Sequence, residues 1–552
     1  MRLARTLCVL LLAAAGGVAA AAVVAKETVC TITVNSPDEQ ETFRRFLPES
    51  KYTFVDLVER GSSDWLASAC RAAVSCDVLI ISAHYDGGNV FFSDRLDASE
   101  YLTVNELERA SCSGSCPALF ARLKEVYLFG CNTLNPVPQS GASAEIVRNL
   151  VRDGLSFNDA KRQLQSLRAA HGESSRDRMR QIFKDVPVIY GFSSTAPVGP
   201  VAGTSLTRYF RANGDREIAS RRPSMRLLDA FAAFGMSVAT GITDRDPHAD
   251  ARADMCQFAD DRLSTATKLA FVHQILQRHI GEARLHLDRI QRLTASLDEH
   301  VRHQPTVVQA LEDIGRDAGA RARFLGYARD AEEPSVRQRL IDLARDVGWL
   351  SERERREEQA QMLRALLARD SVGVPEVDLT CSLNQDLQLD GLFNASSLTP
   401  WLNDVPRTAM QACLGSAESR VATLQALISP DEADVRAAQA YLRHRPMTDP
   451  TELRRVAAAV AAMEPGGAQV RALEALARQQ VSDREVLSVL TALFTRTPSW
   501  SVQAAIAGIL IRADLRALDA SELARELIVH RKPAPASGHD MIDALIALLQ
   551  PR

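Results

Sequence analysis

The sequence predicts an α/β domain with an open, mostly parallel sheet and helices on both faces, followed by an all-helical region. Short apolar runs rich in β-branched and aromatic residues alternate with helical segments between Cys30 and about Ser194, which is typical of a parallel sheet with helical crossovers. Strand signals almost vanish after about Gly241. The 552 residues also exceed what one hydrophobic core usually organises, so we expect more than one domain.

The α/β domain is expected to span residues 26–243 and to contain five strands. Each strand is a short apolar run that ends in polar or turn residues: Val29–Asn35, Tyr52–Val58, Val78–Ala83, Glu125–Gly130 and Val186–Phe192. Helical segments are expected at residues 64–74, 103–110, 142–153 and 156–169. They supply the crossovers that parallel strands require.

The remainder of the chain is expected to be helical. An acidic stretch at residues 244–254, DRDPHADARAD, is predicted to be a linker, and residues 255–425 form a first helical region. Residues 426–552 contain recurring helix starts, each with an N-cap oxygen: Ser429-Pro430, Asp449-Pro450, Ser482, Thr497-Pro498 and Asp519. With one more start after Gly466-Gly467, the spacing of about 15 to 20 residues suits stacked, HEAT-like helix pairs. An irregular helical bundle is the alternative.

Residues 1–25 have the build of a cleaved secretory signal peptide, with two arginines, an apolar run, and small residues that end at Ala22 or Ala25. A retained membrane anchor is the alternative, because the apolar run approaches spanning length. Its many Ala and Gly residues favour cleavage. We therefore expect a secreted or periplasmic protein with no stable membrane span.

The overall composition limits the classes of function. Hydrophobic residues make up 46% of the chain and charged residues 24%, as in globular proteins. The net charge is −4, and basic residues are spread through helical segments, so a nucleic-acid partner is not expected.

The number of cysteines points to one special thiol. Of ten cysteines, Cys8 lies in the signal peptide, and nine remain in the mature chain. Most should pair in an oxidising compartment, and an odd number leaves one over. The preferred pairs are Cys30 with Cys76, at the starts of two candidate strands, and Cys112 with Cys116, on either side of a Ser-Gly-Ser turn.

Two predicted strands end in residues that can carry out acyl transfer. His84 follows the run VLIISA, and Cys131 follows the run VYLFG. Because the carboxyl ends of parallel strands form one crevice, these two side chains are expected to meet there. The imidazole would take the thiol proton and later protonate the leaving amine, while the thiolate attacks a carbonyl carbon.

The residues around this pair resemble the caspase-hemoglobinase clan of cysteine peptidases, within it the CHAT domains and, more distantly, the gingipain and clostripain type. LFGCNT is similar to the CHAT nucleophile motif, and LTVNELERA, at residues 102–110, is similar to the helix between the His and Cys strands. The resemblance covers Cys30 to about Gly199. It implies a peptidase with His84 and Cys131 as its catalytic pair and a peptide or protein substrate.

Four further residues are expected to contact the substrate or the developing oxyanion: Asp86, Gly87, Gly88 and Asn132. The chain departs from the family at Tyr85, where a glycine usually follows the His. His171-Gly172 has the family dipeptide but follows the Cys, so we regard it as a coincidental match.

Other motifs give no support to a cofactor or metal. The alternating acidic residues at 244–250 lack the Gly and Glu of an EF-hand, and the histidines at 273, 279 and 286 lack HExxH spacing. The sequence thus predicts an exported cysteine endopeptidase without cofactor. The alternative is an inactive relative that serves as a binding scaffold through its helical region.

Overall fold

The computed structural model describes residues 26–57, 66–93, 100–114, 116–137, 147, 151, 155–171, 174–278, 280–393, 400–401, 403–479, 481–514, 519–533 and 541–549. The expected signal peptide and nearly all of the helix expected at 142–153 lie outside these residues. The chain divides into two compact units, residues 1–274 with 281–289, and residues 275–280 with 290–552. We call them the α/β unit and the helical unit and describe each by itself.

The α/β unit is built on a six-stranded sheet with the order β2-β1-β3-β7-β8-β9. Its first five strands in that order are parallel, and β9 runs antiparallel to β8. The strands are β1 (Glu27–Thr33), β2 (Tyr52–Asp56), β3 (Val78–Ser82), β7 (Glu125–Phe129), β8 (Val188–Phe192) and β9 (Met236–Ala239). Every residue of β3, β7 and β8 is buried, as expected for a sheet covered on both faces.

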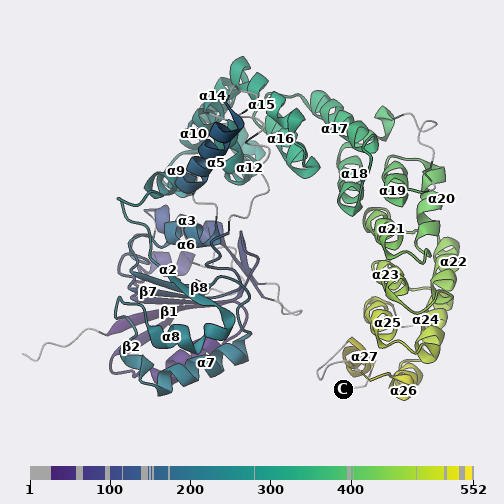
Figure 1. Cartoon of the computed structure of the whole chain (residues 1–552), viewed down its shortest axis with the longest axis horizontal. Helices are drawn as coiled ribbons and strands as arrows, with labels where there is room; N and C mark the ends of the chain where they lie inside the picture. Colours follow the sequence, from purple (N-terminus) through teal and green to yellow (C-terminus); the bar gives the residue numbers. More distant parts are fainter. Residues whose placement is uncertain are drawn as a thin grey trace, which may run out of the picture. The chain divides into compact units, whose positions relative to one another are not determined.

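Helices cover the two faces of this sheet (Figure 1). On one face α1 (Asp38–Phe46), α7 (Gly199–Arg211) and α8 (Met225–Ala230) share a core with Ile80 and Tyr127. On the other face α2 (Ala67–Arg71), α3 (Val104–Cys112) and α6 (Ser175–Ile182) share a core with Leu79 and Leu128. Adjacent residues of one strand therefore enter opposite cores, which is the period of two that strand geometry imposes.

A second, three-stranded antiparallel sheet lies directly after β3. It consists of β4 (His84–Tyr85), β5 (Val90–Phe92) and β6 (Tyr101–Thr103), in the order β4-β5-β6. Tyr85, Phe91 and Leu102 are register partners and are buried in the α3 core. The sequence did not predict this sheet, because its strands are only two or three residues long.

The five predicted strands are present, with ends shifted by at most two residues. The expected helix at 64–74 is the shorter α2, that at 103–110 is α3, and that at 156–169 is α5 (Phe157–His171). Strand β9 was not predicted. Its short MSVA run carries little strand signal of its own and is stabilised by pairing with β8.

Residues 244–254, expected to be a linker, lie within the α/β unit. Much of the stretch belongs to α9 (Ala249–Ala259), which packs against α3 and α6. Its charges are used in contacts: Asp246 pairs with Arg180, and Arg252 donates to the Gln181 carbonyl and to Ser111. An acidic composition cannot reveal such partners, which explains why the sequence suggested a solvated segment.

The described cysteines form four disulfides, three of them in the α/β unit. The expected Cys30–Cys76 pair is formed, with its Cα atoms 5.7 Å apart. The expected Cys112–Cys116 pair is not formed, because Cys112 ends α3 against α9 and bonds to Cys256, while Cys116 bonds to Cys70 of α2. The fourth, Cys381–Cys413, joins α18 to α19. Such a set is consistent with an extracellular protein.

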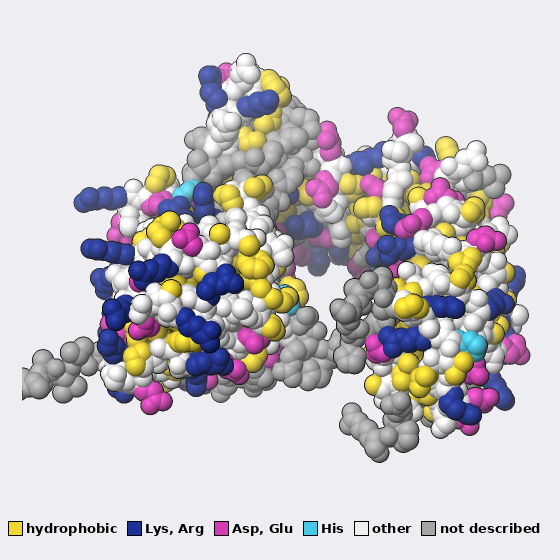
Figure 2. Space-filling view, turned by 60° about the horizontal axis from the view of Figure 1, so that its bottom comes forward, with side chains coloured by type: hydrophobic (Ala, Val, Ile, Leu, Met, Phe, Trp, Pro, Cys, Tyr) yellow, Lys and Arg dark blue, Asp and Glu magenta, His cyan; other side chains and the backbone are white. Residues whose placement is uncertain are grey.

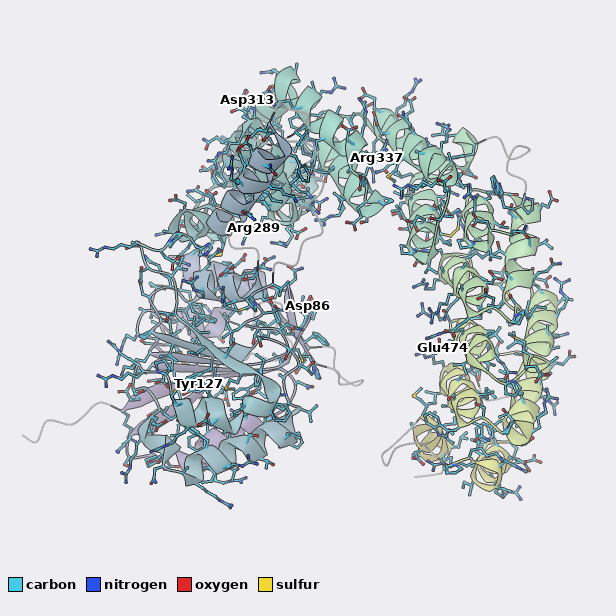
Figure 3. All side chains as sticks on the ribbon, in the orientation of Figure 1. Asp86, Tyr127, Arg289, Asp313, Arg337 and Glu474 are labelled. Carbon is cyan, nitrogen blue, oxygen red and sulfur yellow. A yellow bond between two sulfur atoms is a disulfide. The ribbon has the colours of Figure 1, made fainter. Side chains whose placement is uncertain are left out.

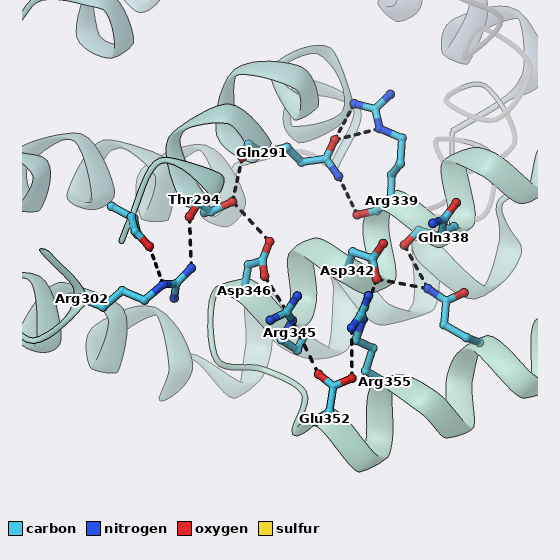
Figure 4. A network of polar contacts seen from close by, with 12 residues as sticks. Gln291, Thr294, Arg302, Gln338, Arg339, Asp342, Arg345, Asp346, Glu352 and Arg355 are labelled. Atoms are coloured by element: carbon cyan, nitrogen blue, oxygen red, sulfur yellow. Dashed lines mark hydrogen bonds and ion pairs between the residues drawn. The ribbon is translucent and has the colours of Figure 1, made fainter. Parts of the chain in front are cut away.

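From residue 265 onward the described chain is helical. The helices up to the middle of this region are α10 (Thr265–Gln277), α11 (Ile280–Leu285), α12 (Leu287–Ala295), α13 (Glu299–Arg302), α14 (Pro305–Gly315), α15 (Ala318–Asp330), α16 (Pro334–Asp346), α17 (Glu352–Leu367) and α18 (Val374–Leu387). Polar contacts join α12, α16 and α17 (Figure 4): Arg339 donates to Gln291, and Arg355 pairs with Asp342. Among the described residues, none of the helices is both long and apolar enough to cross a bilayer.

The last helices stack in two layers. They are α19 (Val405–Cys413), α20 (Ala417–Ala426), α21 (Glu432–His444), α22 (Pro450–Ala461), α23 (Gly467–Leu476), α24 (Arg484–Arg496), α25 (Trp500–Arg512), α26 (Ala520–His530) and α27 (Met541–Leu549). The odd-numbered helices from α19 to α27 contact one another in sequence, as do α22, α24 and α26. This is the stacked arrangement that the recurring helix starts predicted.

Most of the predicted helix starts lie within two residues of an observed N-cap. Asp449, Gly466 and Asp519 are N-caps as expected, whereas Asp431, Asp483 and Ser499 replace neighbouring Ser or Thr residues. Figure 2 shows mainly Lys and Arg side chains among the charged groups on the visible face of the α/β unit, and side chains of both charges on that of the helical unit.

We predict that Cys131 alone among the described cysteines reacts with N-ethylmaleimide in the unreduced, denatured protein, because the other eight form disulfides. Peptide mapping without reduction is the measurement, and it should yield Cys70–Cys116 and Cys112–Cys256 peptides. A Cys112–Cys116 peptide, or Cys131 in a disulfide, would contradict the structure.

Candidate functional site

The candidate site lies at the carboxyl edge of the sheet, where one row of register positions contains both predicted catalytic residues. β3 pairs Val78 with Glu125 and Ser82 with Phe129, so register partners differ by 47 positions. His84 and Cys131 also differ by 47 positions. Adjacent strands are about 5 Å apart, so the two residues leave the sheet side by side.

The segments that contain His84 and Cys131 come close together at Gly130, just before Cys131. A Cβ atom at Gly130 would lie 3.0 Å from the Ala83 carbonyl oxygen and 3.1 Å from Tyr85 Cβ. These two residues flank His84. Ala83 N–H also donates to Phe129 O at 3.1 Å, which extends the ladder beyond β3. Glycine favours this close approach, because a side chain at position 130 would push the His84 segment away by a few tenths of an ångström.

His84 is held by Asn35, a residue that follows β1. Asn35 Nδ2 lies 2.9 Å from His84 Nε2, and Ser93 Oγ lies 3.3 Å from Asn35 Oδ1. Since β1 pairs Thr33 with Ser82, Asn35 occupies the register position of His84 on the neighbouring strand. The row thus runs Asn35, His84, Cys131 across β1, β3 and β7.

Asn35 can orient the imidazole in either tautomer. With its nitrogen toward the ring the amide donates to Nε2, and with nitrogen and oxygen exchanged it accepts from Nε2–H. The Ser93 hydroxyl can serve both orientations, because it donates and accepts. The second orientation leaves the ring proton on Nε2, which makes the other ring nitrogen the base.

Cys131 is partly exposed and is the free cysteine of the described chain. Its Sγ accepts a hydrogen bond from Ala196 N–H at 3.3 Å. The next residue, Asn132, has a left-handed backbone with φ of 59°, and its N–H donates to Ser194 O at 2.7 Å. Asparagine tolerates this conformation better than most residues, so the chain turns sharply and presents the thiol at the sheet edge.

Thr133, the last residue of the LFGCNT motif, clamps this turn to the sheet. Its Oγ1 donates to Gly130 O at 3.1 Å and accepts from Phe192 N–H at 3.1 Å, and the residue is fully buried. A Cβ atom at Gly191 would lie 2.6 Å from this oxygen. The threonine therefore has a structural function.

The loop after His84 differs from what the sequence suggested. Asp86, labelled at the rim of the unit in Figure 3, accepts backbone N–H bonds from Gly88, Asn89 and Val90 at 2.7 to 3.0 Å. Its carboxylate therefore closes a turn, and the Gly88 and Asn132 N–H groups are already used. Gly87 is buried, and its N–H and that of Cys131 have no acceptor among the described residues.

Two side chains of α6 fix this loop. Ser175 Oγ donates to Gly87 O at 2.5 Å, and Arg178 donates to Gly88 O and, at 3.1 Å, to Asn89 Oδ1. Arg178 also pairs at 2.9 Å with the buried carboxylate of Glu108, which raises the pKa of Arg178 against the opposing effect of burial. The loop that carries Gly87 is thereby rigid relative to the sheet.

Tyr85, the residue after His84, belongs to the core. It is buried, and its ring stacks on Phe91 with centroids 4.6 Å apart. Burial raises its pKa to about 12. The position after the His is thus a core position in this chain, and the glycine with a positive φ, +87°, comes two residues later at Gly87.

A buried carboxylic acid, Glu39, lies next to the end of β3. Glu39 of α1 is 3% exposed, next to Ser82, and its Oε2 has no hydrogen-bond partner in the part of the chain that is described. Burial raises its pKa from 4.5 to about 7. The Glu39 carboxyl is therefore largely neutral below pH 7 and carries a buried charge above it.

The other candidates from the sequence do not assemble into a site. His286 is buried, with Nε2 3.6 Å from Asp254, and His248 lies 3.9 Å from Asp177. Across the residues with described positions, no group of three His, Cys, Asp or Glu side chains could hold a metal ion. The side chain of His171 lies outside the described part.

Sequence reasoning missed Asn35, Ser175, Arg178 and Ala196. Asn35 had a detectable signal, because it is a polar residue at the carboxyl end of a predicted strand, as His84 and Cys131 are. The other three act through main-chain contacts or lie far along the chain, and no local pattern marks them. The chain matches no protein-family model, no curated protein and no solved structure.

We predict that Glu39→Gln stabilises the α/β unit increasingly as pH rises from 4.5 to 7. Below pH 4.5 the carboxyl is protonated in both folded and unfolded chains; between 4.5 and 7 only the unfolded chain ionises, so the wild type loses stability. Above pH 7 the ionisation of Glu39 lowers the free energy of unfolding of the wild type by about 3 kcal/mol in total. Urea denaturation from pH 4 to 8 is the measurement.

Glu41→Gln, an exposed residue on the same helix, is the matched control and should show no such trend. If the advantage of Glu39→Gln were the same at every pH, the pKa assigned to Glu39 would be wrong.

Proposed function

We propose that the α/β unit is an exported cysteine endopeptidase of the caspase-hemoglobinase type, with Cys131 as nucleophile and His84 as general base and acid. The observation that carries the proposal is that His84 and Cys131 each follow, two residues on, the paired ends of the parallel strands β3 and β7, Ser82 and Phe129. A cysteine beside a histidine in an edge crevice is the arrangement that thiol peptidases need.

The reaction would proceed in two halves. His84 takes the Cys131 proton, and the sulfur attacks the carbonyl carbon of the scissile peptide bond to give a tetrahedral oxyanion. The C–N bond then breaks as His84 returns the proton to the leaving amine, which leaves a thioester. Water, deprotonated by His84, attacks the thioester carbon and releases the acid and the free thiol.

Other residues support these steps. The N–H groups of Cys131 and Gly87 are the proposed oxyanion donors, aimed by the turn at Asn132 and by the contacts of Ser175. Asn35 is proposed as a positioning residue that keeps the imidazole between β1 and β7. The two-layered helical unit would recruit a protein substrate, because stacked helices offer a broad surface.

The competing proposal is an inactive scaffold. It is favoured by the same helical unit and by Tyr85, which occupies the position where the family places glycine. The two proposals differ in one respect: only the peptidase needs His84 and Cys131 to act as a unit.

We predict that Cys131→Ala and His84→Ala each reduce hydrolysis of a mixed peptide library by at least about a hundredfold, because proton transfer or the covalent route is lost. The double variant should be hardly worse than either single one, since groups of one catalytic unit are not additive. Rates of peptide-bond cleavage and thermal unfolding curves are the measurements.

His303→Ala, an exposed histidine of the helical unit, is the control and should keep full activity. The unfolding temperature of the two site variants should stay near that of the wild type. Wild-type rates in either site variant, or no hydrolysis by the wild type, would favour the scaffold.

A further inference from the structure

The small sheet beside the site has an unusual outer face. His84 pairs with Phe92 across β4 and β5, and Phe92 pairs with Tyr101 across β5 and β6. The alternate residues Tyr85, Phe91 and Leu102 form the buried face. The outer face therefore carries three rings in cross-strand register, which we call the aromatic row: His84, Phe92 and Tyr101.

Phe92 and Tyr101 are accessible, and the ring of Phe92 contacts His84, the proposed catalytic base. The rings of His84 and Phe92 have centroids 5.5 Å apart. Phe92 is 37% exposed and Tyr101 56% exposed. The solvated face of an antiparallel sheet usually carries polar side chains, so two exposed aromatic rings in register need a reason other than folding.

The row is also held at a fixed position relative to the site. Ser93, next to Phe92, contacts the amide of Asn35, which itself contacts His84. Ser93 N–H donates to Glu100 O at 3.0 Å, which continues the β5–β6 pairing beyond Phe92 and Tyr101. The strand that carries Phe92 is thus fixed to the same amide that contacts His84, so its ordering costs no entropy when a ligand binds.

We propose that Phe92 and Tyr101 form a subsite for an aromatic or large aliphatic side chain of the substrate, on the leaving-group side of the scissile bond. This inference rests on the proposed peptidase function. The residue that protonates the leaving amine must lie beside the first residue after the bond. Because the row starts at His84 and extends away from Cys131, it lies along the path of that part of the substrate.

The size of the row limits which substrate residues it contacts. The rings of His84 and Phe92 have centroids 5.5 Å apart, and in an extended peptide the side chains that share a face belong to alternate residues, about 7 Å apart. Phe92 and Tyr101 therefore serve the first and third residues after the scissile bond. Stacking on ring faces selects apolar and aromatic side chains, and the exposed hydroxyl of Tyr101 tolerates a polar tip.

The test is a cleavage profile of a peptide library, read by mass spectrometry at each position around the cut. Wild type should be enriched in Phe, Tyr, Trp and Leu at the first or third position after the cut. Phe92→Ala with Tyr101→Ala should reduce that enrichment by about tenfold, with the preference before the cut unchanged. Tyr101→Ala alone should reduce it in part, and it leaves the ring that touches His84 in place.

Conservative and matched controls keep the result interpretable. Tyr101→Phe should retain the enrichment, and so should Phe157→Ala, an exposed aromatic residue of α5. Enrichment that survives the double alanine change, or a wild-type profile without enrichment after the cut, would overturn the subsite alone. Absence of any cleavage by the wild type would overturn the peptidase function together with the subsite.

Discussion

The parallel register of β3 and β7 is the constraint on which the candidate site depends. It places positions that differ by 47 residues opposite each other, and the chain then leaves both strands with a polar residue at the same level. The neighbouring register of β1 and β3 adds Asn35 to the same row. A slip of one residue would turn one side chain to the other face of the sheet and separate the pair.

Several features of the unit protect that register. Gly130 allows the two strand ends to approach, and Thr133 joins the cysteine turn to β8. The disulfide between Cys30 and Cys76 fastens β1 to the start of β3. Ser175 and Arg178 of α6 hold the loop after His84 by donating to the carbonyl oxygens of Gly87 and Gly88. The site is therefore built on rigid elements, and its chemistry would depend on small displacements.

The sequence was informative where the signal was local. The runs VLIIS and EVYLF predicted β3 and β7, and the residues after them predicted the His84 and Cys131 positions at one sheet edge. The free thiol at Cys131 followed from the odd number of cysteines. Capping residues such as Asp449 and Asp519 marked helix starts because an N-cap is a local contact.

Long-range contacts were not predictable in the same way. The partner of Cys112 is 144 residues away, and the nearer Cys116 was the natural but wrong choice. The carboxylate of Asp86 looked available for a substrate, yet it accepts three N–H groups of its own loop. Acidic residues 244–254 suggested a linker, whereas Asp246 and Arg252 bind α6 and α3. Each of these depends on partners that only the folded chain brings together.

The most direct measurement is the rate at which iodoacetamide alkylates Cys131 in the intact protein near neutral pH, in the wild type and in His84→Ala. A histidine that takes the thiol proton increases the fraction of reactive thiolate. The account predicts alkylation at least about tenfold slower in His84→Ala, with Asn35→Ala between the two. Equal rates in the wild type and His84→Ala would show that the two residues share a row without acting on each other.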